Sequence, residues 1–411
     1  MKNIKVIILL SVFGCFKTLN GQSLDSFLTL GAEHSLALKK AYADVEISLL
    51  NIDKVSVIQD PTISFGYFIK PIETRLGSQV SKFSLRQKVP WFGQVSKEKE
   101  VLKHRAQMNY HVFETKKQTL FLDIKTIYYS LLEAKERIQI KEEHLKLLYD
   151  DKKQAQTRYE QGKQSKIDLI RIELEIDELI SEIKGLQLEL EKQKQSFNFK
   201  LHRSFDTEIS IIEPLKMPTS ENSNSKINLE SHPSIKILDE NIEMNQSGIE
   251  FSKAKNKPKL SLGLDYTIIE MIPNSTIVNN GNDAFWPTIQ LSIPISSSKN
   301  KAEIKTAELM LEKAELSKEH MVLELKNQFS SLELETQSLI NDIVQLNSTL
   351  SKYEQILNLQ YFEYKTFKLK FEDILKTKKD ILKVKYNRLS KLKQLNIVQA
   401  QMEFYSYSVK Q

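Results

Sequence analysis

The chain has 411 residues, with 59 Lys and Arg against 53 Asp and Glu, a formal net charge of +6, and only 11 Gly and 10 Pro. Glycine and proline make up about 7% and 5% of an average chain, so both helix breakers stand near half their usual level. The small net charge does not indicate a nucleic-acid partner. A compact α/β enzyme needs frequent loops marked by Gly or Pro, so the composition favours long helices instead.

The first 22 residues have the pattern of a secretory signal peptide. A basic start precedes the apolar stretch Val6–Phe16, and small polar residues follow it. The stretch is too short to span a bilayer as a permanent helix. Cys15 is the only cysteine. It is either the lipid-modified first residue of the mature chain or a leader residue that is removed, and in both cases the mature chain has no internal disulfide.

Comparison of the sequence with itself predicts two copies of one unit. The segment Pro61–Gly66 matches Pro258–Gly263, and Asp168 with its apolar followers matches Asp373. The offset grows from 197 to 205 residues between these two matches, which one insertion in one loop explains. We therefore expect repeat 1 over residues 23–203, a linker rich in Pro, Ser and Asn over 204–231, and repeat 2 over 232–411.

Each repeat is predicted to contain the same elements in the same order. An opening helix, two strands and a long helical hairpin follow one another, because period-two apolar patterns alternate with long stretches free of Gly and Pro. In the first strand, for example, Ile63, Phe65 and Tyr67 alternate with smaller or polar residues. The expected ranges are 24–57, 61–90 and 95–201 in repeat 1, and 233–256, 258–295 and 299–403 in repeat 2.

The strand segments have the length of membrane strands. Their patterns run over nine to twelve residues, and a tilted membrane strand needs about 9–11. Trp91 closes the second segment and Trp286 opens the fourth, where the aromatic girdles of a membrane barrel lie. Both are therefore candidate membrane-interface anchors; two tryptophans in a soluble core are the alternative. Four strands cannot close a barrel, so the membrane interpretation requires several copies of the chain.

The long helices carry a coiled-coil pattern. Ile124, Leu131 and Ile138 recur every seven residues with charged flanks. No Gly or Pro occurs between Val95 and Glu160, and Gly162 then breaks the helix, so the chain is expected to fold back as a hairpin. The predicted fold class is mainly α with a small transmembrane β part. A solid coiled-coil rod would explain the heptads but not the strand pairs.

No catalytic or metal-binding motif stands out. The seven histidines are scattered without an HExxH pattern, and no second cysteine is present to share a zinc ion. The spacing of His104 and His111 on one helix suits metal ligation, but no carboxylate motif joins them, so packing is the preferred interpretation. There is no Gly-rich phosphate loop. We expect neither an enzyme nor a cofactor or metal.

Taken in order, these segments resemble the outer membrane efflux protein family, the TolC-like channels, over essentially the whole mature chain. The resemblance depends on the duplicated unit and on three segments in sequence, Val89–Gly93, Tyr159–Lys163 and Phe371–Leu375. It implies a homotrimer in which two-repeat protomers build a 12-stranded β-barrel continued by an α-helical barrel. Such a protein lies in the outer membrane, in contact with its lipid, and extends into the periplasm.

The resemblance also implies a function. It suggests the passive exit duct of a tripartite efflux or type I secretion system, joined to an inner-membrane pump through a periplasmic adaptor protein. A periplasmic coiled-coil adaptor or structural scaffold without a pore is the alternative from another class. The two differ in whether the apolar strand faces tolerate charge.

Site residues follow from the same resemblance. Asp168, Tyr364 and Asp373 match a periplasmic gate, in which Tyr364 and Asp168 can bond each other and a ring of Asp373 favours cations. Helix capping is the alternative for both aspartates. Gly162 and Phe367 mark the hairpin turns and are the expected docking tips for the adaptor. Phe367 stands where the family turn usually has Gly.

Overall fold

The computed structural model describes residues 23–55, 59–210, 213–218, 228–274, 276–365 and 370–406. The predicted signal peptide with Cys15 lies outside the described residues, as does Phe367 at the second hairpin turn. Within the described ranges, no helix is both long enough and apolar enough to cross a membrane.

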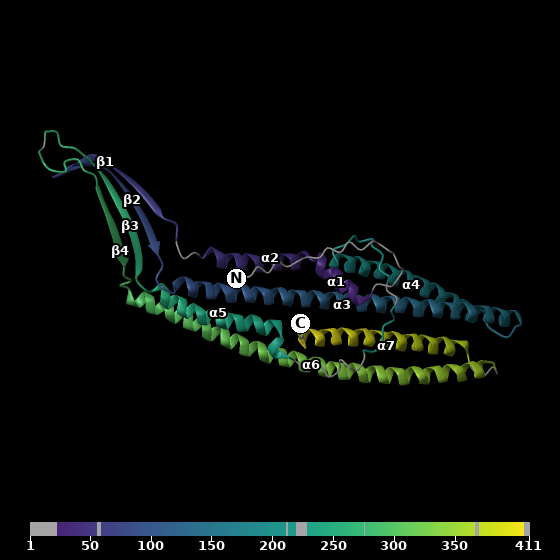
Figure 1. Cartoon of the computed structure of the whole chain (residues 1–411). Coiled ribbons are helices and arrows are strands. Elements are labelled where there is room, and N and C mark those ends of the chain that lie inside the picture. The colour runs from purple at the N-terminus through teal and green to yellow at the C-terminus, as the bar shows by residue number, and fades with distance from the viewer. Residues whose placement is uncertain are drawn as a thin grey trace. The chain divides into compact units, whose positions relative to one another are not determined.

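Long helices dominate the fold, and four strands complete it (Figure 1). This confirms the predicted fold class. In chain order the elements are α1 (Leu24–His34), α2 (Leu36–Lys54), β1 (Thr62–Thr74), β2 (Gly77–Val89), α3 (Gln94–Glu160), α4 (Lys166–Lys200), the short 3₁₀ helix η2 (Leu229–Ser231), α5 (Pro233–Lys255), β3 (Lys259–Glu270), β4 (Ala284–Ser292), α6 (Ser297–Lys365) and α7 (Phe371–Tyr405).

The opening helix of the first repeat is interrupted, which the sequence pattern did not predict. Ser35 leaves the helical conformation, with φ −61° and ψ 114°, and its hydroxyl accepts a hydrogen bond from the Leu38 amide at 3.3 Å. A serine in this position satisfies an amide that the start of a helix leaves without a partner. The apolar spacing runs on across the break, so periodicity alone suggested one continuous helix.

The chain divides into two compact units. Among the described residues, unit 1 draws on those within 23–34, 124–217 and 342–394, and unit 2 on those within 35–123, 218–341 and 395–406. The helices α3, α6 and α7 each contribute residues to both units.

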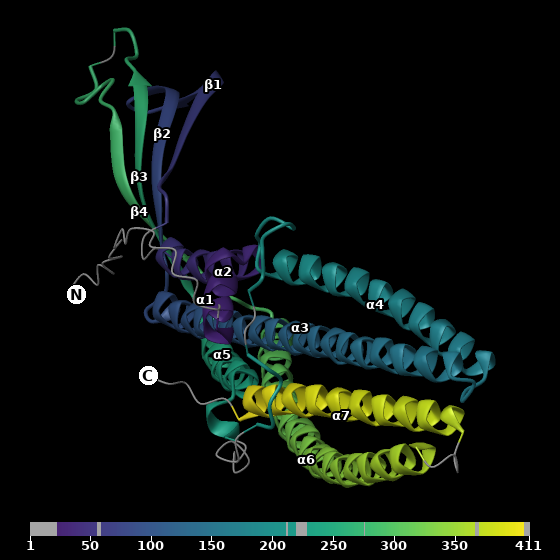
Figure 2. The same ribbon diagram turned by 90° about the vertical axis from the view of Figure 1, so that its right-hand side faces the viewer.

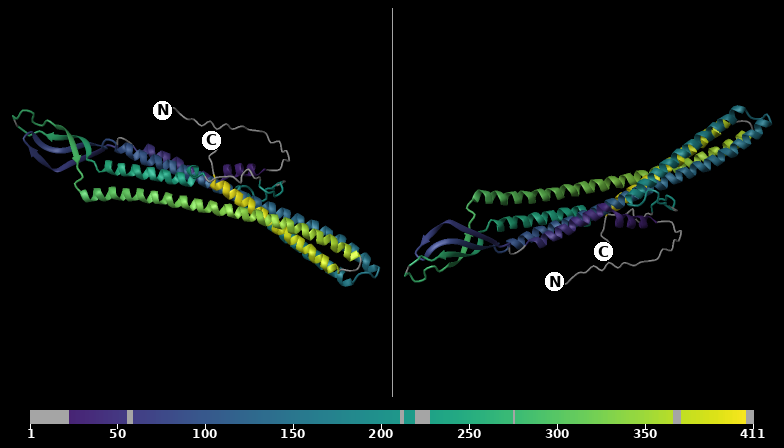
Figure 3. Two further views of the ribbon diagram at one scale, coloured as in Figure 1. Left: turned by 90° about the horizontal axis from the view of Figure 1, so that it is seen from below. Right: turned by 90° about the horizontal axis from the view of Figure 1, so that it is seen from above.

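In unit 1, α3 lies beside α4 and α6 lies beside α7, so two helical hairpins form its framework (Figures 2 and 3). Their seams are apolar, as the heptads predicted: Ile124, Leu131 and Leu148 of α3 are completely or almost completely buried. A larger cluster joins α3, α4 and α7; its buried members are Ile138, Leu148, Ala155, Ile172, Ile176, Leu179, Ile183, Phe371 and Ile374.

Two buried charged residues that interrupt this seam are paired across the helices. Lys141, which breaks the heptad pattern of α3, is buried and binds the Glu182 carboxylate of α4 at 2.5 Å. Its ammonium also lies 4.8 Å from the centre of the Tyr386 ring. Further along α3, Asp151 forms an ion pair with Lys378 of α7 in which both side chains are buried, whereas Glu182 is exposed. A buried charge without a partner would be very costly, so these pairs specify how the helices align.

A glycine lets α1 approach α3 closely in unit 1. A Cβ atom on Gly31 would lie 2.4 Å from Cδ1 of Ile124, which has no exposed surface. Next to this contact, the Phe27 ring packs edge-on against Phe197 with centroids 4.9 Å apart, and Tyr128 lies 6.1 Å from Phe27.

Unit 2 holds its helices together by side-chain hydrogen bonds and ion pairs. Asn109 of α3 donates to the Ser48 hydroxyl of α2 at 2.5 Å, and His104 of α3 lies 2.8 Å from the Glu240 carboxylate of α5. His104 therefore has a packing role between helices, as its sequence setting suggested.

The four strands form one antiparallel sheet in the order β1-β2-β3-β4, all within unit 2. Pairs such as Phe65 with Phe83 and Phe83 with Tyr266 set the register. Prolines occur in the strands at the two edges, Pro71 in β1 and Pro287 in β4, because an edge strand tolerates a missing amide hydrogen. The strand β4 ends at Ser292, before Pro294, so the strand pattern predicted to continue to residue 295 extended too far.

Candidate functional site

One face of the sheet consists of exposed apolar side chains. In a single row across the strands, Phe65, Phe83 and Tyr266 stand side by side, and the rings of Phe65 and Phe83 lie 4.8 Å apart. The exposed fractions on this face range from 36% at Ile268 to 76% at Ile289. The members are Ile63, Phe65, Tyr67, Phe83, Leu85, Leu262, Leu264, Tyr266, Ile268, Phe285, Ile289 and Leu291. We call this surface the apolar face; a soluble protein rarely leaves so large an apolar patch open.

The opposite side is here called the polar face. It contains every charged residue of the paired segments that lie between the helices and the two β-bulges, which occur between Tyr67 and Ile72 and between Gln79 and Ser81. The register brings small, hydroxyl and charged side chains together on it. Four are basic and one is acidic. In order, the positions are Thr62, Ser64, Gly66, Lys82, Ser84, Arg86, Lys88, Lys259, Ser261, Gly263, Asp265, Thr267, Trp286, Thr288, Gln290 and Ser292.

Asp265 is the centre of a hydrogen-bonded cluster on the polar face. Its side chain is 1% exposed. It accepts hydrogen bonds from the Ser84 hydroxyl at 2.5 Å and from the Thr288 hydroxyl at 3.2 Å. Lys82 lies 3.1 Å and Arg86 3.5 Å from the same carboxylate oxygen. Two cations and two hydroxyls therefore satisfy this one buried negative charge.

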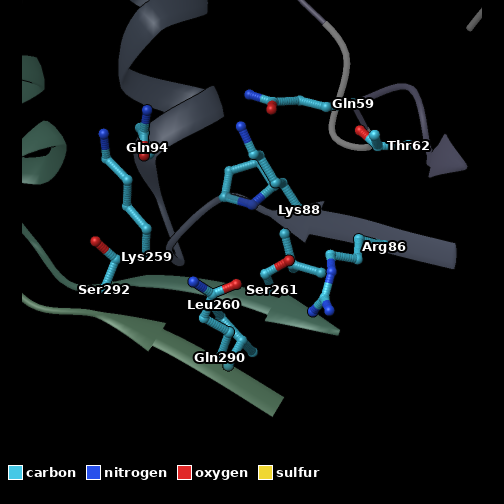
Figure 4. Close-up of a pocket in the computed structure, with 12 residues that line it drawn as sticks. Gln59, Thr62, Arg86, Lys88, Gln94, Lys259, Leu260, Ser261, Gln290 and Ser292 are labelled. Carbon is cyan, nitrogen blue, oxygen red and sulfur yellow. The ribbon is translucent and has the colours of Figure 1, made fainter. Parts of the chain in front are cut away.

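A cavity of about 620 Å³ opens on the polar face where the strands meet the helices (Figure 4). Arg86 and Lys88 of β2 and Lys259 of β3 contribute to its wall, together with the hydroxyl of Ser261 and the amide of Gln290. No carboxylate is among the residues that line it. The cavity lies wholly within unit 2.

The two tryptophans have different surroundings. Trp91 follows the end of β2 and is half-buried, with its ring 6.4 Å from that of Phe92. Phe92 itself is 93% exposed. Trp286 pairs with Asp265 in the register and has the Lys82 ammonium 4.8 Å from its ring centre, so it belongs to the polar face. The structure thus does not support a lipid-facing anchor at Trp286, because its neighbour Phe285 occupies the apolar face instead.

Gly162 forms the turn between α3 and α4 in unit 1. Its φ is +69°, a conformation that glycine adopts without strain. The Gly162 amide donates to the Tyr159 carbonyl at 2.8 Å, and the next amide, of Lys163, donates to the Arg158 carbonyl at 2.8 Å. Ser165 then caps α4 by accepting from the Ile167 amide at 3.1 Å. The predicted break of the first hairpin is therefore a regular helix end with a new helix start close behind it.

Tyr364 near the end of α6 contacts this turn. Its hydroxyl donates to the Gln164 side-chain oxygen at 2.6 Å, and the Arg158 guanidinium lies 4.4 Å from the centre of its ring. Burial raises the pKa of Tyr364 above its ordinary value, so the hydroxyl keeps its proton at neutral pH. The predicted partner of Tyr364 was Asp168, but in the structure the hydroxyl bonds to Gln164.

The two candidate gate carboxylates lie in equivalent positions. Asp168 is in the first turn of α4 and Asp373 in the first turn of α7, and both are half-buried. Ser165, not Asp168, is the capping residue of α4. Asp168 instead places a negative charge near the positive end of the helix dipole.

Sequence reasoning missed the residues that actually join the hairpins in unit 1. Gln164 and Arg158 contact Tyr364, and Arg171 of α4 binds the Glu372 carboxylate of α7 at 2.6 Å. Only their closeness in sequence to the turn residues could have indicated them. In the part of the chain that the structure describes, no group of three or more His, Cys, Asp or Glu is placed to hold a metal ion.

The chain matches no protein-family model and no curated protein. Solved structures do match it. The channel protein CusC aligns with a TM-score of 0.74 at 15% identity, over 93% of this chain and 91% of that one. The outer-membrane channel OprN gives 0.75 at 14% identity, over 93% and 89%. The outer membrane protein VceC from Vibrio cholerae gives 0.76 at 13% identity, over 93% and 95%.

These similarities extend over nearly the full length of each compared structure. At such low sequence identity they establish the architecture rather than the activity. Together with the mainly helical structure and its four-stranded sheet, they show that this chain has the TolC-like fold of outer membrane efflux channels.

Proposed function

We propose that the protein is an outer membrane channel, a passive exit duct for export from the periplasm. The observation that carries this proposal is the apolar face, whose twelve large side chains are all exposed. Leaving them in water would be costly at about 25 cal/mol per Å² of apolar surface, whereas contact with lipid removes that cost. A scaffold without a pore has no use for such a face.

The sheet also supports an assembly of several copies. The edge strands β1 and β4 each pair on one side only. Unpaired backbone groups in lipid cost several kcal/mol each, so a membrane sheet must close on itself. Three copies would give twelve strands, within the range known for membrane barrels. The fold similarity to solved outer membrane channels supports a closed membrane assembly of this sheet.

Closure places the polar face around a water-filled bore. The helices would continue the bore into the periplasm, where the hairpin turns at Gly162 and near Phe367 would meet a periplasmic adaptor. An inner-membrane pump would supply the energy and choose the cargo. Tyr364, Asp168 and Asp373, at the same ends of the hairpins, would form the gate. No catalytic step is assigned to the chain.

The membrane proposal is tested with two matched arginine substitutions. Leu262→Arg places a charge on the apolar face, while Gln290→Arg places the same charge on the polar face one strand away. An arginine facing lipid near the bilayer midplane costs about 2–4 kcal/mol. We expect Leu262→Arg to reduce the amount of heat-modifiable oligomer in outer membrane fractions strongly and Gln290→Arg to leave it near the wild-type level.

The comparison decides between the two functions. Equal assembly of both variants in the outer membrane would contradict the channel, because a scaffold tolerates charge on either face. Purified protein that stays a monomer without detergent would contradict it as well.

A further inference from the structure

The polar face has a strong excess of positive charge. Lys82, Arg86, Lys88 and Lys259 stand against the single carboxylate of Asp265, which leaves three positive charges per chain. None of the twelve members of the apolar face is charged. The excess is therefore confined to one side of the sheet.

Two of these cations are ion-paired with one shared carboxylate and two are not. Lys82 and Arg86 form ion pairs with Asp265 at 3.1 and 3.5 Å. Among the described residues, neither the Lys88 ammonium nor the Lys259 ammonium takes part in an ion pair or a hydrogen bond; Lys88 accepts one from the Gln87 side chain only through its backbone carbonyl. Both are exposed and both line the cavity at the base of the sheet. The negative charge that would balance them is missing from the cavity wall.

The rest of that wall suits an anion. The hydroxyls of Thr62, Ser261 and Ser292 and the side-chain amides of Gln94 and Gln290 surround the two lysines (Figure 4). Hydroxyls and amide N–H groups donate hydrogen bonds to a carboxylate or a halide as readily as to water. A negatively charged solute thus finds both charge and donors, while a cation finds neither a carboxylate nor an excess of acceptors.

We propose that the strand section of the pore favours anions over cations of similar size. This inference depends on the proposed channel function, which turns the polar face toward the bore. Threefold assembly would multiply three excess charges to nine in one ring-shaped section. Rings of Lys and Arg are the usual means by which pores attract anions. Because the cations are exposed, binding stays weak enough for an anion to leave.

The periplasmic gate opposes this preference. A ring of three Asp373 carboxylates would attract cations, so the two sections act in series and both must be controlled in a test. The charges in the strand section face the water of the bore. Salt in that water screens their field beyond about 10 Å at 0.1 M ionic strength. Measurements therefore belong at low salt.

The experiment measures the reversal potential of the full mature protein in planar lipid bilayers under a tenfold KCl gradient. The variant Lys88→Gln/Lys259→Gln removes the two unpaired charges without exposing Asp265, and Lys88→Arg/Lys259→Arg is its charge-conserving control. Both are compared in the wild-type and the Asp373→Asn background. We expect a chloride-to-potassium permeability ratio above one in Asp373→Asn, and a fall of roughly twofold or more with the glutamines but not with the arginines.

Each outcome is informative. A ratio below one in the Asp373→Asn background, or one that the glutamine variant leaves unchanged in both backgrounds, overturns the anion preference while the channel function stands. Correctly folded trimer that conducts no ions overturns the channel function and the inference with it. A ratio that falls with the glutamine variant and is kept by the arginine variant supports the assignment.

Discussion

Single buried residues of unit 1 show how strongly the environment can change their chemistry. His144 of α3 is buried, and the ammonium groups of Lys378, Lys141, Lys385 and Lys379 all act on it. Burial first, and then these positive charges, lower the pKa of His144 from its ordinary value of 6.5 to about 4. The imidazole is therefore neutral in the folded protein throughout the physiological pH range.

This burial predicts a pH dependence of stability. Between pH 6.5 and 4 the unfolded chain binds a proton at His144 that the folded chain excludes, so protonation favours unfolding. At about 1.4 kcal/mol per pH unit, the free energy of unfolding falls by up to about 3 kcal/mol over this range. We expect His144→Gln to flatten the decrease. The measurement is urea unfolding of wild type and variant at pH 7 and pH 4.5.

Other groups titrate in the same range, notably His232, whose pKa burial also lowers to about 4. They are present in both proteins and cancel in the difference. An identical loss of stability in wild type and His144→Gln would show that His144 does not titrate on unfolding.

Features that depend on neighbouring residues, such as a helix break, could be predicted from the sequence. Side-chain partners that are distant in the sequence could not. Gly162 was predicted to be the hairpin break because it ends a long stretch without Gly or Pro, and its positive φ in the structure agrees. Lys141 stood out as an exception to the heptad, but its partner Glu182 is 41 residues away and no spacing rule identifies it. The bond from Tyr364 to Gln164 spans 200 residues and could not be predicted for the same reason.

At the scale of elements, the long helices and strands were predictable because each follows a simple period. The low content of Gly and Pro fixed where helices run, and alternation fixed which strand residues share a face. The residues at which helices and strands begin and end were harder to predict. The break at Ser35 depends on one capping hydroxyl, and the end of β4 depends on backbone pairing that periodicity does not report.

The close packing of two helices can be tested by substituting two glycines that both lie within helices. Both Gly31 in α1 and Gly185 in α4 lie inside helices, where alanine is favoured by about 1 kcal/mol. A Cβ at Gly185 meets no atom within 4 Å, whereas at Gly31 it meets Ile124 at 2.4 Å. We expect Gly185→Ala to stabilise the protein by up to about 1 kcal/mol and Gly31→Ala to destabilise it by about 1–3 kcal/mol.

Thermal unfolding of the two variants beside wild type measures this difference. The substitution is chemically the same in both variants, so the gain in helix propensity is the same. The difference between their stabilities therefore reports the contact of residue 31 with Ile124. A stabilising Gly31→Ala would mean that Ile124 moves aside without cost and that α1 packs loosely.

For the whole molecule, the sequence predicted the duplicated architecture and the membrane strands, and the fold class is confirmed. The placement of one residue near the end of a strand, Trp286, was not taken from the alternation of apolar and polar residues. Trp286 was expected among lipid-facing aromatics because of its place along the strand, yet the register turns it toward Lys82. A shift of one residue in a strand exchanges the faces, so sequence position alone is a weak guide there.

The proposed gate would be a property of the assembled pore and is tested as such. Tyr364→Phe keeps the ring over Arg158 and removes only the hydroxyl that bonds to Gln164. A neutral hydrogen bond contributes about 0.5–1.5 kcal/mol, so its loss shifts the closed state toward opening by up to about tenfold. We expect a higher mean single-channel conductance or open probability in planar bilayers.

The control Tyr149→Phe makes the same chemical change at an exposed position of α3. It is expected to conduct like wild type. If Tyr364→Phe also conducts like wild type, the contact between the hairpins has only a structural role.

The edge strands of the sheet have a consequence for biogenesis. In the proposed channel, one newly exported chain would carry two edge strands paired on one side only and an apolar surface that further copies of the chain and a bilayer would cover. A solitary copy is therefore the species most exposed to misassociation, and the prolines at positions 71 and 287 reduce that hazard by weakening each margin as a template. Successful insertion should then be a collective event, rising more steeply than linearly with the supply of chains.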